Sequence, residues 1–233
     1  MNIAILGYGR MGKAIEQVAL KRNHKIILKI EDDIAKHDLS KVDVAIDFSI
    51  PTAAFKNITH CFEKNVAAVS GTTGWLDKYE QAIESCTKNG GAFIYASNFS
   101  LGVNVFFNLN SYLAKIMKNL QEYDVSMEEI HHTQKLDKPS GTAITLAQGI
   151  INNSDKTTWA LQGNKGDQVI PIEAKRIPNV PGTHKIKYNS EVDKIEIEHV
   201  AHNREGFALG AVIAAEYLLG KKGVHSMNDV LGL

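Results

Sequence analysis

Hydrophobic and polar residues follow two alternating patterns along the N-terminal part of the chain. Residues 2–6 form a short apolar run that ends at a glycine, and residues 11–21 then place apolar side chains at the i, i+3, i+4 and i+7 spacing of an amphipathic helix. The same succession continues with strand-like runs at 25–30, 42–48, 66–69 and 92–95 and with helical patterns at 53–64 and 76–88. Strands that alternate with helices in this way predict a parallel sheet with helices on its faces.

The pattern changes after the last of these strands. A strand is expected at 123–130, between a helical pattern at 103–119 and another that starts near Ser140. Residues 183–188 and 194–199 alternate apolar and charged side chains, which predicts a hairpin with opposed Lys and Glu side chains. We therefore predict an α/β fold in which a Rossmann-type dinucleotide-binding domain is joined to a smaller α+β domain.

The charge balance favours a small-molecule partner. Lys plus Arg and Asp plus Glu both number 26, so the formal net charge is zero and no broad field favours nucleic acid or an anionic membrane. No segment approaches the roughly 18 apolar residues of a membrane span, and the first residues do not form a signal peptide, so we expect a cytoplasmic protein. The two cysteines, Cys61 and Cys86, lie in helical patterns and are expected to be buried thiols.

The turn between the first strand and the first helix carries a complete GxGxxG motif. Its residues are Gly7, Tyr8, Gly9, Arg10, Met11 and Gly12. In such a motif the first glycine permits a tight turn, the second lets the backbone approach a pyrophosphate, and the third lets the helix pack on the strand. The helix N-terminus also attracts the anion. We therefore expect this turn to bind a dinucleotide.

An acidic residue, Glu31, follows the second strand about 20 residues beyond the glycines, where it can accept hydrogen bonds from the adenosine ribose of NAD. A carboxylate there repels a 2′-phosphate, so NAD should be used at least as well as NADP, while Lys29 and Lys36 keep NADP possible. Two later turns and residues 47–51 lie where parallel strands end, and ligands of open α/β sheets bind at such ends, although ordinary turns explain these segments equally well. The two turns contain Gly71, Thr72, Thr73 and Gly74, and Ala96, Ser97, Asn98 and Phe99.

Proton donors and cations are concentrated around residues 129–143. His131 and His132 end a predicted strand, whose alternation turns them to opposite sides, so that one could donate a proton while the other binds substrate. Lys135 adds a cation that could orient a carboxylate or help to protonate a carbanion or enamine. A hydride reduction needs such a proton.

The same stretch contains the start of a helix. Ser140 is placed to cap it, which leaves the N–H groups of Gly141 and Thr142 to bind a carboxylate, so all three are candidate substrate ligands. A metal site is not expected, because no third His, Cys or carboxylate follows the histidine pair at a recognised ligand spacing.

The segment 129–143, Glu-Ile-His-His-Thr-Gln-Lys-Leu-Asp-Lys-Pro-Ser-Gly-Thr-Ala, resembles the signature of the 4-hydroxy-tetrahydrodipicolinate reductase family. In that signature His-His is followed by Lys and then by Asp-x-Pro-Ser-Gly-Thr-Ala. The resemblance covers both domains, with supporting similarities at residues 9–12, 47–49, 71–74, 98–104, 181–184 and 208–211. The chain departs from some members by a compact GxGxxG and a short second domain, so the resemblance does not fix the individual cofactor contacts or the details of the oligomer.

The resemblance implies a reductase that uses NADH, NADPH or both and acts on a small cyclic dicarboxylate in the diaminopimelate route to lysine. Hydride would pass to the dehydrated substrate to give tetrahydrodipicolinate. By position, His131 would be the proton donor or acceptor, Lys135 a second donor, and His132, Gly141 and Thr142 substrate ligands. The implied cofactor ligands are residues 7–12, Glu31, residues 71–73 and residues 96–99, and Arg204 and Phe207 would be further contacts.

The resemblance also implies the domain boundaries and the assembly. Residues 1–101 and 207–233 would form the dinucleotide-binding domain, and residues 102–206 a substrate-binding domain whose sheet builds a homotetramer. From the residues alone, the last apolar helix at 207–219 fits either domain.

Two alternative functions remain at this point. A dehydrogenase of similar design that acts on another amino or hydroxy acid would share the glycine motif, because a Rossmann domain alone never fixes the substrate. A silent NAD-binding sensor would keep that motif and could lose His131 and Lys135. Both residues are present, which disfavours the sensor.

Overall fold

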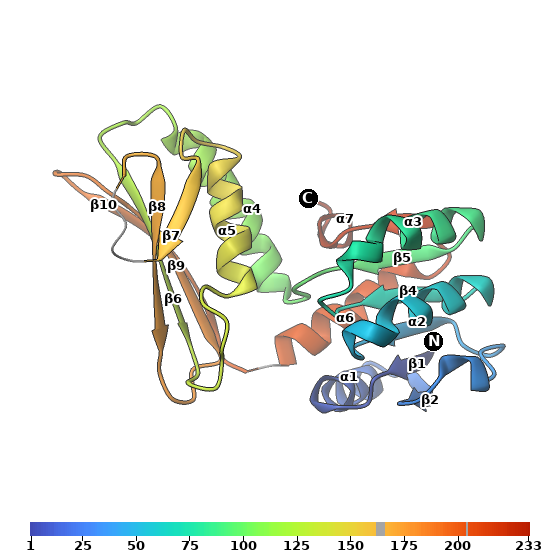
Figure 1. The fold of residues 1–233 in the computed structure, drawn as a ribbon. Helices are drawn as coiled ribbons and strands as arrows, with labels where there is room; N and C mark the ends of the chain where they lie inside the picture. The colour runs from blue at the N-terminus through green and yellow to red at the C-terminus, as the bar shows by residue number, and fades with distance from the viewer. Residues whose placement is uncertain (162–165, 204) are drawn as a thin grey trace. The chain divides into compact units, whose positions relative to one another are not determined.

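Two compact units make up the computed structural model, which describes residues 1–161, 166–203 and 205–233 (Figure 1). The first unit consists of Met1–Leu101 and Glu205–Leu233, and the second of Gly102–Arg204. The chain returns to the first unit at Glu205, two residues before the expected position, because the last long helix begins there. Each unit has its own sheet and hydrophobic core.

A six-stranded sheet forms the centre of the first unit, and all of its strand pairs are parallel, as predicted. The strand order is β11-β5-β4-β3-β1-β2. The bounds are β1 Asn2–Leu6, β2 Lys25–Ile30, β3 Val44–Asp47, β4 Ala67–Ser70, β5 Ala92–Tyr95 and β11 Gly223–His225. The sequence patterns identified the first five strands. They missed β11, which is too short to show an alternation.

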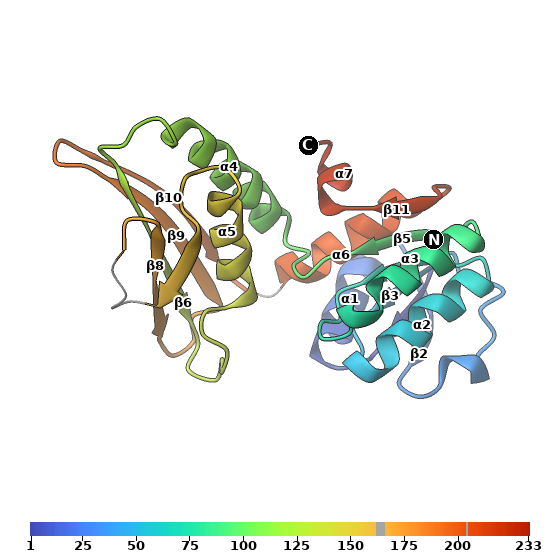
Figure 2. The same ribbon diagram turned by 45° about the horizontal axis from the view of Figure 1, so that its top comes forward.

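Helices cover both faces of this sheet (Figures 1 and 2). On one face are α1 Arg10–Lys21 and α6 Glu205–Leu218, and on the other are α2 Pro51–Glu63 and α3 Tyr79–Lys88. The short elements are η1 Ile34–Lys36, η2 Leu76–Lys78 and α7 Met227–Leu231, so the helix expected at 76–88 is divided into η2 and α3. Cys61 and Cys86 are free and fully buried in α2 and α3, which confirms the prediction of buried thiols.

The strand order creates a switch point between β1 and β3. The connection from β1 leads to β2 on one side, and the connection from β2 returns to β3 on the other side of β1. Gly7, directly after β1, has a φ of +87°, and a Cβ on it would lie 2.3 Å from the carbonyl oxygen of Phe48, directly after β3. Only glycine therefore fits at Gly7, and the two turns meet where α/β sheets bind ligands.

A five-stranded mixed sheet with order β10-β9-β6-β8-β7 forms the second unit. Its strands are β6 Asp124–His131, β7 Thr158–Leu161, β8 Val169–Arg176, β9 Gly182–Asn189 and β10 Lys194–Ala201. The antiparallel pairing of β9 and β10 confirms the predicted hairpin. The strands β7 and β8 were not predicted, because neither segment alternates clearly and β8 contains Pro171.

Two helices, α4 Leu101–Met117 and α5 Gly141–Ile151, pack with buried residues of this sheet into one hydrophobic cluster (Figure 2). The predicted Lys and Glu contacts of the hairpin are present. Lys185 lies 3.2 Å from Glu198, and Lys187 lies 4.0 Å from Glu196. These partly exposed pairs stabilise the hairpin only weakly.

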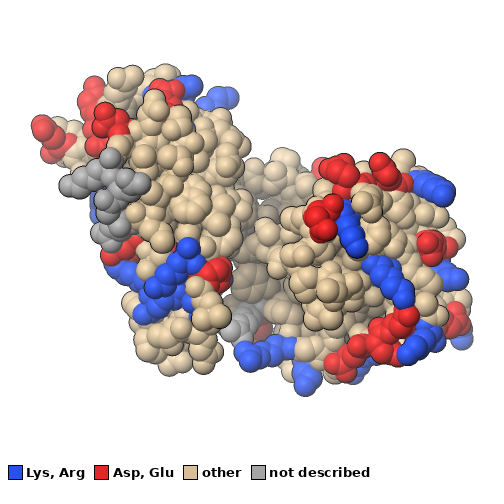
Figure 3. Space-filling model, viewed as in Figure 1, with Lys and Arg blue, Asp and Glu red and all other residues tan. Residues whose placement is uncertain are grey.

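Acidic and basic side chains are interspersed on the visible surface of each unit (Figure 3). Among the helices that the structure describes, none is long and apolar enough to cross a membrane.

Candidate active site

The turn between β1 and α1 is the first candidate ligand site. Helix α1 begins directly after Gly9, which has no side chain to cap it, so the first backbone N–H groups are offered to an anion. Among the residues that the structure describes, no heavy atom would lie within 4 Å of a Cβ at Gly9, whereas a Cβ at Gly12 would lie 2.4 Å from the Gly7 carbonyl oxygen. Open space beside a tightly packed helix start fits a dinucleotide pyrophosphate.

The side chain of Tyr8 is held by α1 and β2. Its hydroxyl group donates a hydrogen bond to Glu16 and accepts one from Lys29 Nζ at 3.0 Å, and Lys29 forms an ion pair with Glu16 at 2.7 Å. Lys29 also lowers the pKa of Glu16. The ammonium group of Lys29, which could have favoured NADPH, is therefore paired with the carboxylate of Glu16.

Three consecutive acidic residues follow β2, and their surroundings differ. Asp32 contacts His37 at 2.6 Å and Lys36 at 3.3 Å, and these hydrogen bonds, His37 first, lower the pKa of Asp32. Asp33 caps η1 and pairs with Lys56 at 2.6 Å. Glu31 is exposed and has no side-chain partner among the residues that the structure describes. It is the acid that remains available to a ligand.

A buried carboxylate, Asp47, ties the turns after β3 and β4 together. Its Oδ1 accepts hydrogen bonds from Ser49 Oγ at 2.6 Å and Asn57 Nδ2 at 3.1 Å, and its Oδ2 accepts from Thr72 Oγ1 at 2.7 Å and Ser70 Oγ at 3.0 Å. All four donors are neutral. Burial raises the pKa of Asp47, and the hydrogen bonds oppose that shift.

Phe48 extends this connection to two more turns. A Cβ at Gly71 would lie 2.3 Å from Phe48 Cζ, and the rings of Phe48 and Phe99 are 5.9 Å apart. The N–H of Ala96 donates to the Ser70 carbonyl oxygen at 3.2 Å. The carboxyl edge of the sheet thus collects the predicted cofactor residues. Of these, Thr72, Asn98 and Phe99 are buried, and Thr73 and Ser97 are exposed.

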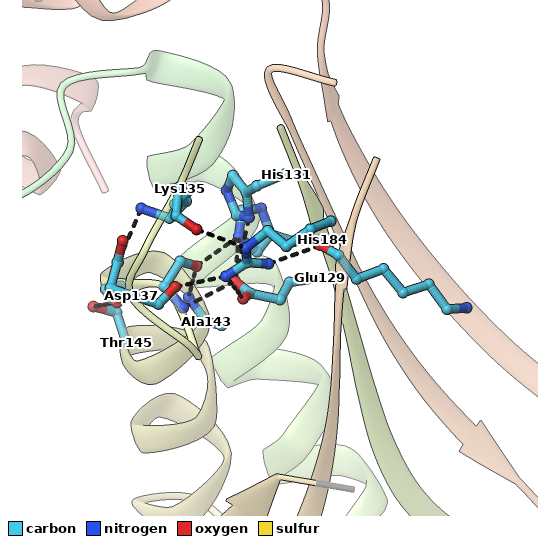
Figure 4. Close-up of polar contacts among 11 residues, drawn as sticks. Glu129, His131, Lys135, Asp137, Ala143, Thr145 and His184 are labelled. Carbon is cyan, nitrogen blue, oxygen red and sulfur yellow. Dashed lines mark hydrogen bonds and ion pairs between the residues drawn. The ribbon is translucent and has the colours of Figure 1, made fainter. Parts of the chain in front are cut away.

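In the second unit, the side chains of Glu129, His131 and His184 lie together at the end of β6 (Figure 4), and Arg176 contacts Glu129. Glu129 and His131 are two residues apart on the strand and therefore face the same side of the sheet. His184 of β9 is the register partner of Glu129, and Arg176 of β8 is the register partner of His131. The rings of His131 and His184 are 5.0 Å apart at an interplanar angle of 70°.

Glu129 is the fully buried centre of this group. Its Oε1 accepts a hydrogen bond from Arg176 Nη2 at 3.1 Å, and its Oε2 accepts one from the backbone N–H of Ser140 at 3.0 Å. The Nδ1 of His131 lies 3.4 Å from Oε2, and the Nε2 of His184 lies 3.9 Å from it. One carboxylate therefore contacts groups from four segments of the chain.

The loop after β6 is held by Arg176. Its guanidinium donates to the carbonyl oxygen of Asp137 at 2.6 Å and to that of Lys135 at 3.2 Å. Within the loop, Lys135 Nζ lies 2.9 Å from the carboxylate of Asp137 (Figure 4). These contacts fix the backbone that carries the predicted cation.

The loop leads into α5, and the predicted cap is confirmed. Ser140 Oγ accepts a hydrogen bond from the N–H of Ala143 at 3.2 Å and lies 3.3 Å from His184 Nε2. No heavy atom in the described part of the chain would lie within 4 Å of a Cβ at Gly141, so these residues leave space beside the helix start. Thr142 lies in the same first turn.

Burial lowers the pKa of both histidines, to about 4 for His131 and about 3 for His184. The charge of Glu129 opposes this shift at His131, whereas the cations Lys135 and Arg176 add to it. Both rings are therefore neutral at neutral pH in this arrangement. Neighbouring His132 lies outside the network, and its buried Nδ1 has no hydrogen-bond partner among the described residues.

Three of these side chains satisfy a simple spacing test for a cation. The ligand atoms of Glu129, His131 and His184 lie within 4.8 Å of one another, although these residues do not follow a recognised ligand spacing in the sequence. However, both oxygens of Glu129 already accept hydrogen bonds, and two cationic side chains, Arg176 and Lys135, lower the pKa of His131. The absence of a metal therefore stays a prediction.

Sequence reasoning assigned no role to Glu129, Arg176 or His184. Glu129 begins the informative stretch, and His184 shares a strand face with the apolar residues Ile186 and Tyr188, but nothing local marks Glu129 and His184 as neighbours. Arg176 lies on β8, a strand that the patterns missed. Arg204, which the resemblance implies as a contact, lies outside the described residues.

Comparisons with known proteins cover both units. Residues 1–99 match the family described as dihydrodipicolinate reductase, N-terminus, and residues 102–231 match dihydrodipicolinate reductase, C-terminus. A 4-hydroxy-tetrahydrodipicolinate reductase of Christiangramia forsetii is 61% identical over 99% of this chain and 98% of its own. One of Thermosipho africanus is 35% identical over the same shares.

Solved structures agree. A dipicolinate-bound dihydrodipicolinate reductase from a Paenisporosarcina species matches with a TM-score of 0.76 and 25% identity over 97% of each chain. A probable dehydrogenase from Thermotoga maritima, at 9% identity and a TM-score of 0.61 over 99% of this chain and 92% of its own, shares the fold alone. With both of its units matched and a relative of high identity along its length, the chain belongs to the dihydrodipicolinate reductase family.

Proposed function

We propose that this chain reduces the dehydrated form of 4-hydroxy-tetrahydrodipicolinate to tetrahydrodipicolinate, a step of the diaminopimelate route to lysine. As a family member the chain is an oxidoreductase with a nicotinamide cofactor, which supplies the hydride when bound. The observation that carries the proposal is the arrangement of His131, Lys135 and the start of α5 after one strand. These groups offer a proton, a cation and N–H donors to a dicarboxylate.

The first unit holds the dinucleotide in this proposal. The uncapped start of α1 and the open space at Gly9 support a pyrophosphate at residues 7–12. The turns at 71–73 and 96–99, which meet at the same sheet edge, would contact the nicotinamide end. Glu31 would accept hydrogen bonds from the ribose hydroxyls, and its charge makes NADH at least as good a cofactor as NADPH.

The second unit holds the substrate. The Paenisporosarcina relative binds dipicolinate, a ring with two carboxylates. Here the N–H groups of Gly141 and Thr142 and the hydroxyl of Ser140 would receive one carboxylate at the start of α5. Lys135 would receive the other when it exchanges Asp137 for the substrate, and His132 would add a further hydrogen bond.

His131 would move the proton. Hydride addition places an electron pair on the ring, and a neighbouring ring carbon must then accept one proton. His131 is neutral at neutral pH because burial and the adjacent cations disfavour its charged form. A dianionic substrate beside Lys135 would offset the charge of those cations and raise the pKa of His131. The imidazolium form of His131 would then form when substrate is bound, and Lys135 would be a second proton donor.

The sheet of the second unit would also build a homotetramer. Support comes from family membership and from exposed apolar side chains on β10, Ile195 and Val200. Sedimentation equilibrium measures the assembly directly, and a monomer at micromolar concentration would contradict this part of the proposal.

A coupled assay tests the proposed function. Freshly generated 4-hydroxy-tetrahydrodipicolinate is added to the full chain, and oxidation of NADH is followed by absorbance, with dipicolinate as a competing ligand. We expect turnover that depends on both substrates and that dipicolinate inhibits. No substrate-dependent NADH or NADPH oxidation would contradict the proposal.

A further inference from the structure

The contacts of Glu129 connect the two halves of the proposed substrate site. One oxygen, Oε2, holds the N–H of Ser140 at 3.0 Å, and this residue caps α5, where a carboxylate would bind. The same oxygen is 3.4 Å from Nδ1 of His131, the proposed proton donor. The other oxygen, Oε1, is anchored by Arg176. A shift of this carboxylate would therefore disturb the anion site and the proton donor together.

The two nitrogens of His131 have different surroundings. Nδ1 is buried and has no hydrogen-bond partner among the described residues, although Glu129 Oε2 is close enough to accept its proton after a small adjustment. Nε2 lies beside Gly182, where a Cβ would be 3.2 Å away, so the missing side chain leaves room at that nitrogen. The hydrogen bond at one nitrogen decides which tautomer the ring adopts. A proton on Nδ1 leaves Nε2 for proton exchange with the substrate.

The charged and titratable groups around His131 come from every neighbouring segment. They are Glu129 of β6, Arg176 of β8, His184 of β9, and Lys135 and Asp137 of the loop, and His199 of β10 lies next to His184 in the sheet. The two cations and the burial disfavour an imidazolium ion, and Glu129 is the fully buried anion that opposes them. The protonated form of His131 therefore depends on the Glu129 carboxylate for its stabilisation.

We propose that Glu129 is a positioning residue of the reaction, which orients His131 through Nδ1, stabilises its protonated form and holds the Ser140 turn in place. This inference rests on the proposed function. Because Glu129 is fully buried, it would act on the reaction from behind His131 and not by contact with substrate or cofactor. Its effect reaches the reaction through His131, in the way that carboxylates behind catalytic or metal-binding histidines fix ring orientation and basicity.

The test compares Glu129→Gln with Glu128→Gln in the reductase assay. Glu128 is the adjacent residue of β6, faces the opposite side of the sheet and pairs with Lys175, so the control removes a similarly buried charge from the same strand. For Glu129→Gln we expect kcat to fall about 10- to 100-fold. We also expect the alkaline limb of the kcat profile to move to lower pH by about one unit, because the imidazolium ion loses its anion. Glu128→Gln keeps the wild-type profile, with the oligomeric state of both variants checked.

The outcomes separate this inference from the proposed function. Wild-type protein without reductase activity contradicts the function itself. An active wild type together with a Glu129→Gln variant of unchanged kcat, or of reduced kcat with an unmoved pH limb, overturns the positioning role. If Glu129→Gln does not fold, Glu129→Asp keeps the charge and withdraws it by one methylene group, and we expect a smaller fall in kcat, about 3- to 10-fold. Wild-type kcat and pH limb in Glu129→Asp would equally overturn the inference.

Discussion

Each unit organises its strand ends around one buried carboxylate, but the two carboxylates have different partners. Asp47 in the first unit is bound by four neutral donors, three hydroxyl groups and one amide. Glu129 in the second unit is bound by a guanidinium and a backbone N–H, and two histidines lie beside it. The first arrangement has a fixed shape, whereas the second contains groups whose charge can change.

The difference corresponds to the two proposed tasks. A dinucleotide brings its own charges and needs turns of defined shape, which neutral hydrogen bonds to Asp47 provide. A reduction needs a proton at a defined atom, and a ring whose protonation responds to nearby charge can supply it. In this proposal the first unit binds the cofactor and the second binds the substrate and transfers the proton, so variants in each unit should change different kinetic constants.

The largest effect is expected from the proton donors. His131→Ala or Lys135→Ala should lower kcat by about 10²- to 10⁴-fold, the usual contribution of a general acid. NADH binding should persist, because both residues belong to the second unit. Kinetics and NADH fluorescence titration measure the two effects separately. Loss of NADH binding in these variants would contradict the division of tasks.

Acid should destabilise the second unit through its histidines. The pKa of His184 falls from 6.5 to about 3 in the folded protein, so the unfolded chain binds a proton first as the pH falls below 6.5. The stability that the neutral ring contributes is complete above pH 6.5 and is lost toward pH 3. Between pH 6.5 and 4.5 the loss is about 2–3 kcal/mol, at about 1.4 kcal/mol per unit. Urea unfolding of wild type and His184→Gln measures it, and an equal pH slope in both would contradict the assignment.

Asp47 should respond with the opposite sign. Burial raises the pKa of Asp47 above its ordinary value of 3.8, so the folded protein takes up this proton before the unfolded chain does as the pH falls. The contribution of Asp47 to stability is present below its pKa in the unfolded chain and is lost as the pH rises through its pKa in the folded protein. The variant Asp47→Asn should therefore lose a pH dependence of the free energy of unfolding whose sign is opposite to that contributed by His184.

Local patterns in the sequence predict much of the first unit and part of the second. The glycine turn, the five strands around it and the Ser140 cap depend on neighbours in sequence, so spacing alone indicates them. The contacts of Glu129 with Arg176 and His184 join residues 47 and 55 positions apart through a mixed sheet. Such pairings depend on strand order, which no local period contains.

Buried charge is the second feature that sequence reasoning missed. Asp47 and Glu129 are acidic residues in strands, and acidic residues are usually expected at the surface. Each is stabilised inside by donors from other segments, and these become visible only when the chain is folded. Both residues lie in segments that resemble the reductase family, and this position indicates that they have a role without showing which groups they bind.

Asp47→Asn should affect cofactor binding more than turnover. The amide can no longer accept from all four donors, so the turns after β3 and β4 loosen, and KM for NADH should rise about 10-fold, equivalent to one charged hydrogen bond. The matched control is Asp43→Asn. Asp43 lies just before β3, and its carboxylate accepts a hydrogen bond from the Asn2 N–H at 2.6 Å. A large fall in kcat with unchanged KM for NADH would break the proposed contrast between the units.

The smallest effect is expected at Glu31, because an exposed carboxylate binds a ribose in competition with water. Glu31→Gln should raise KM for NADH about 3- to 5-fold and lower KM for NADPH, since a neutral amide no longer repels a 2′-phosphate. Asp32→Asn is the matched control, because its carboxylate is already engaged by His37 and Lys36. If the Asp32 variant changed the ratio of the two KM values and the Glu31 variant did not, the ribose contact would belong to Asp32, and the ion pairs around it would have to open when the dinucleotide binds.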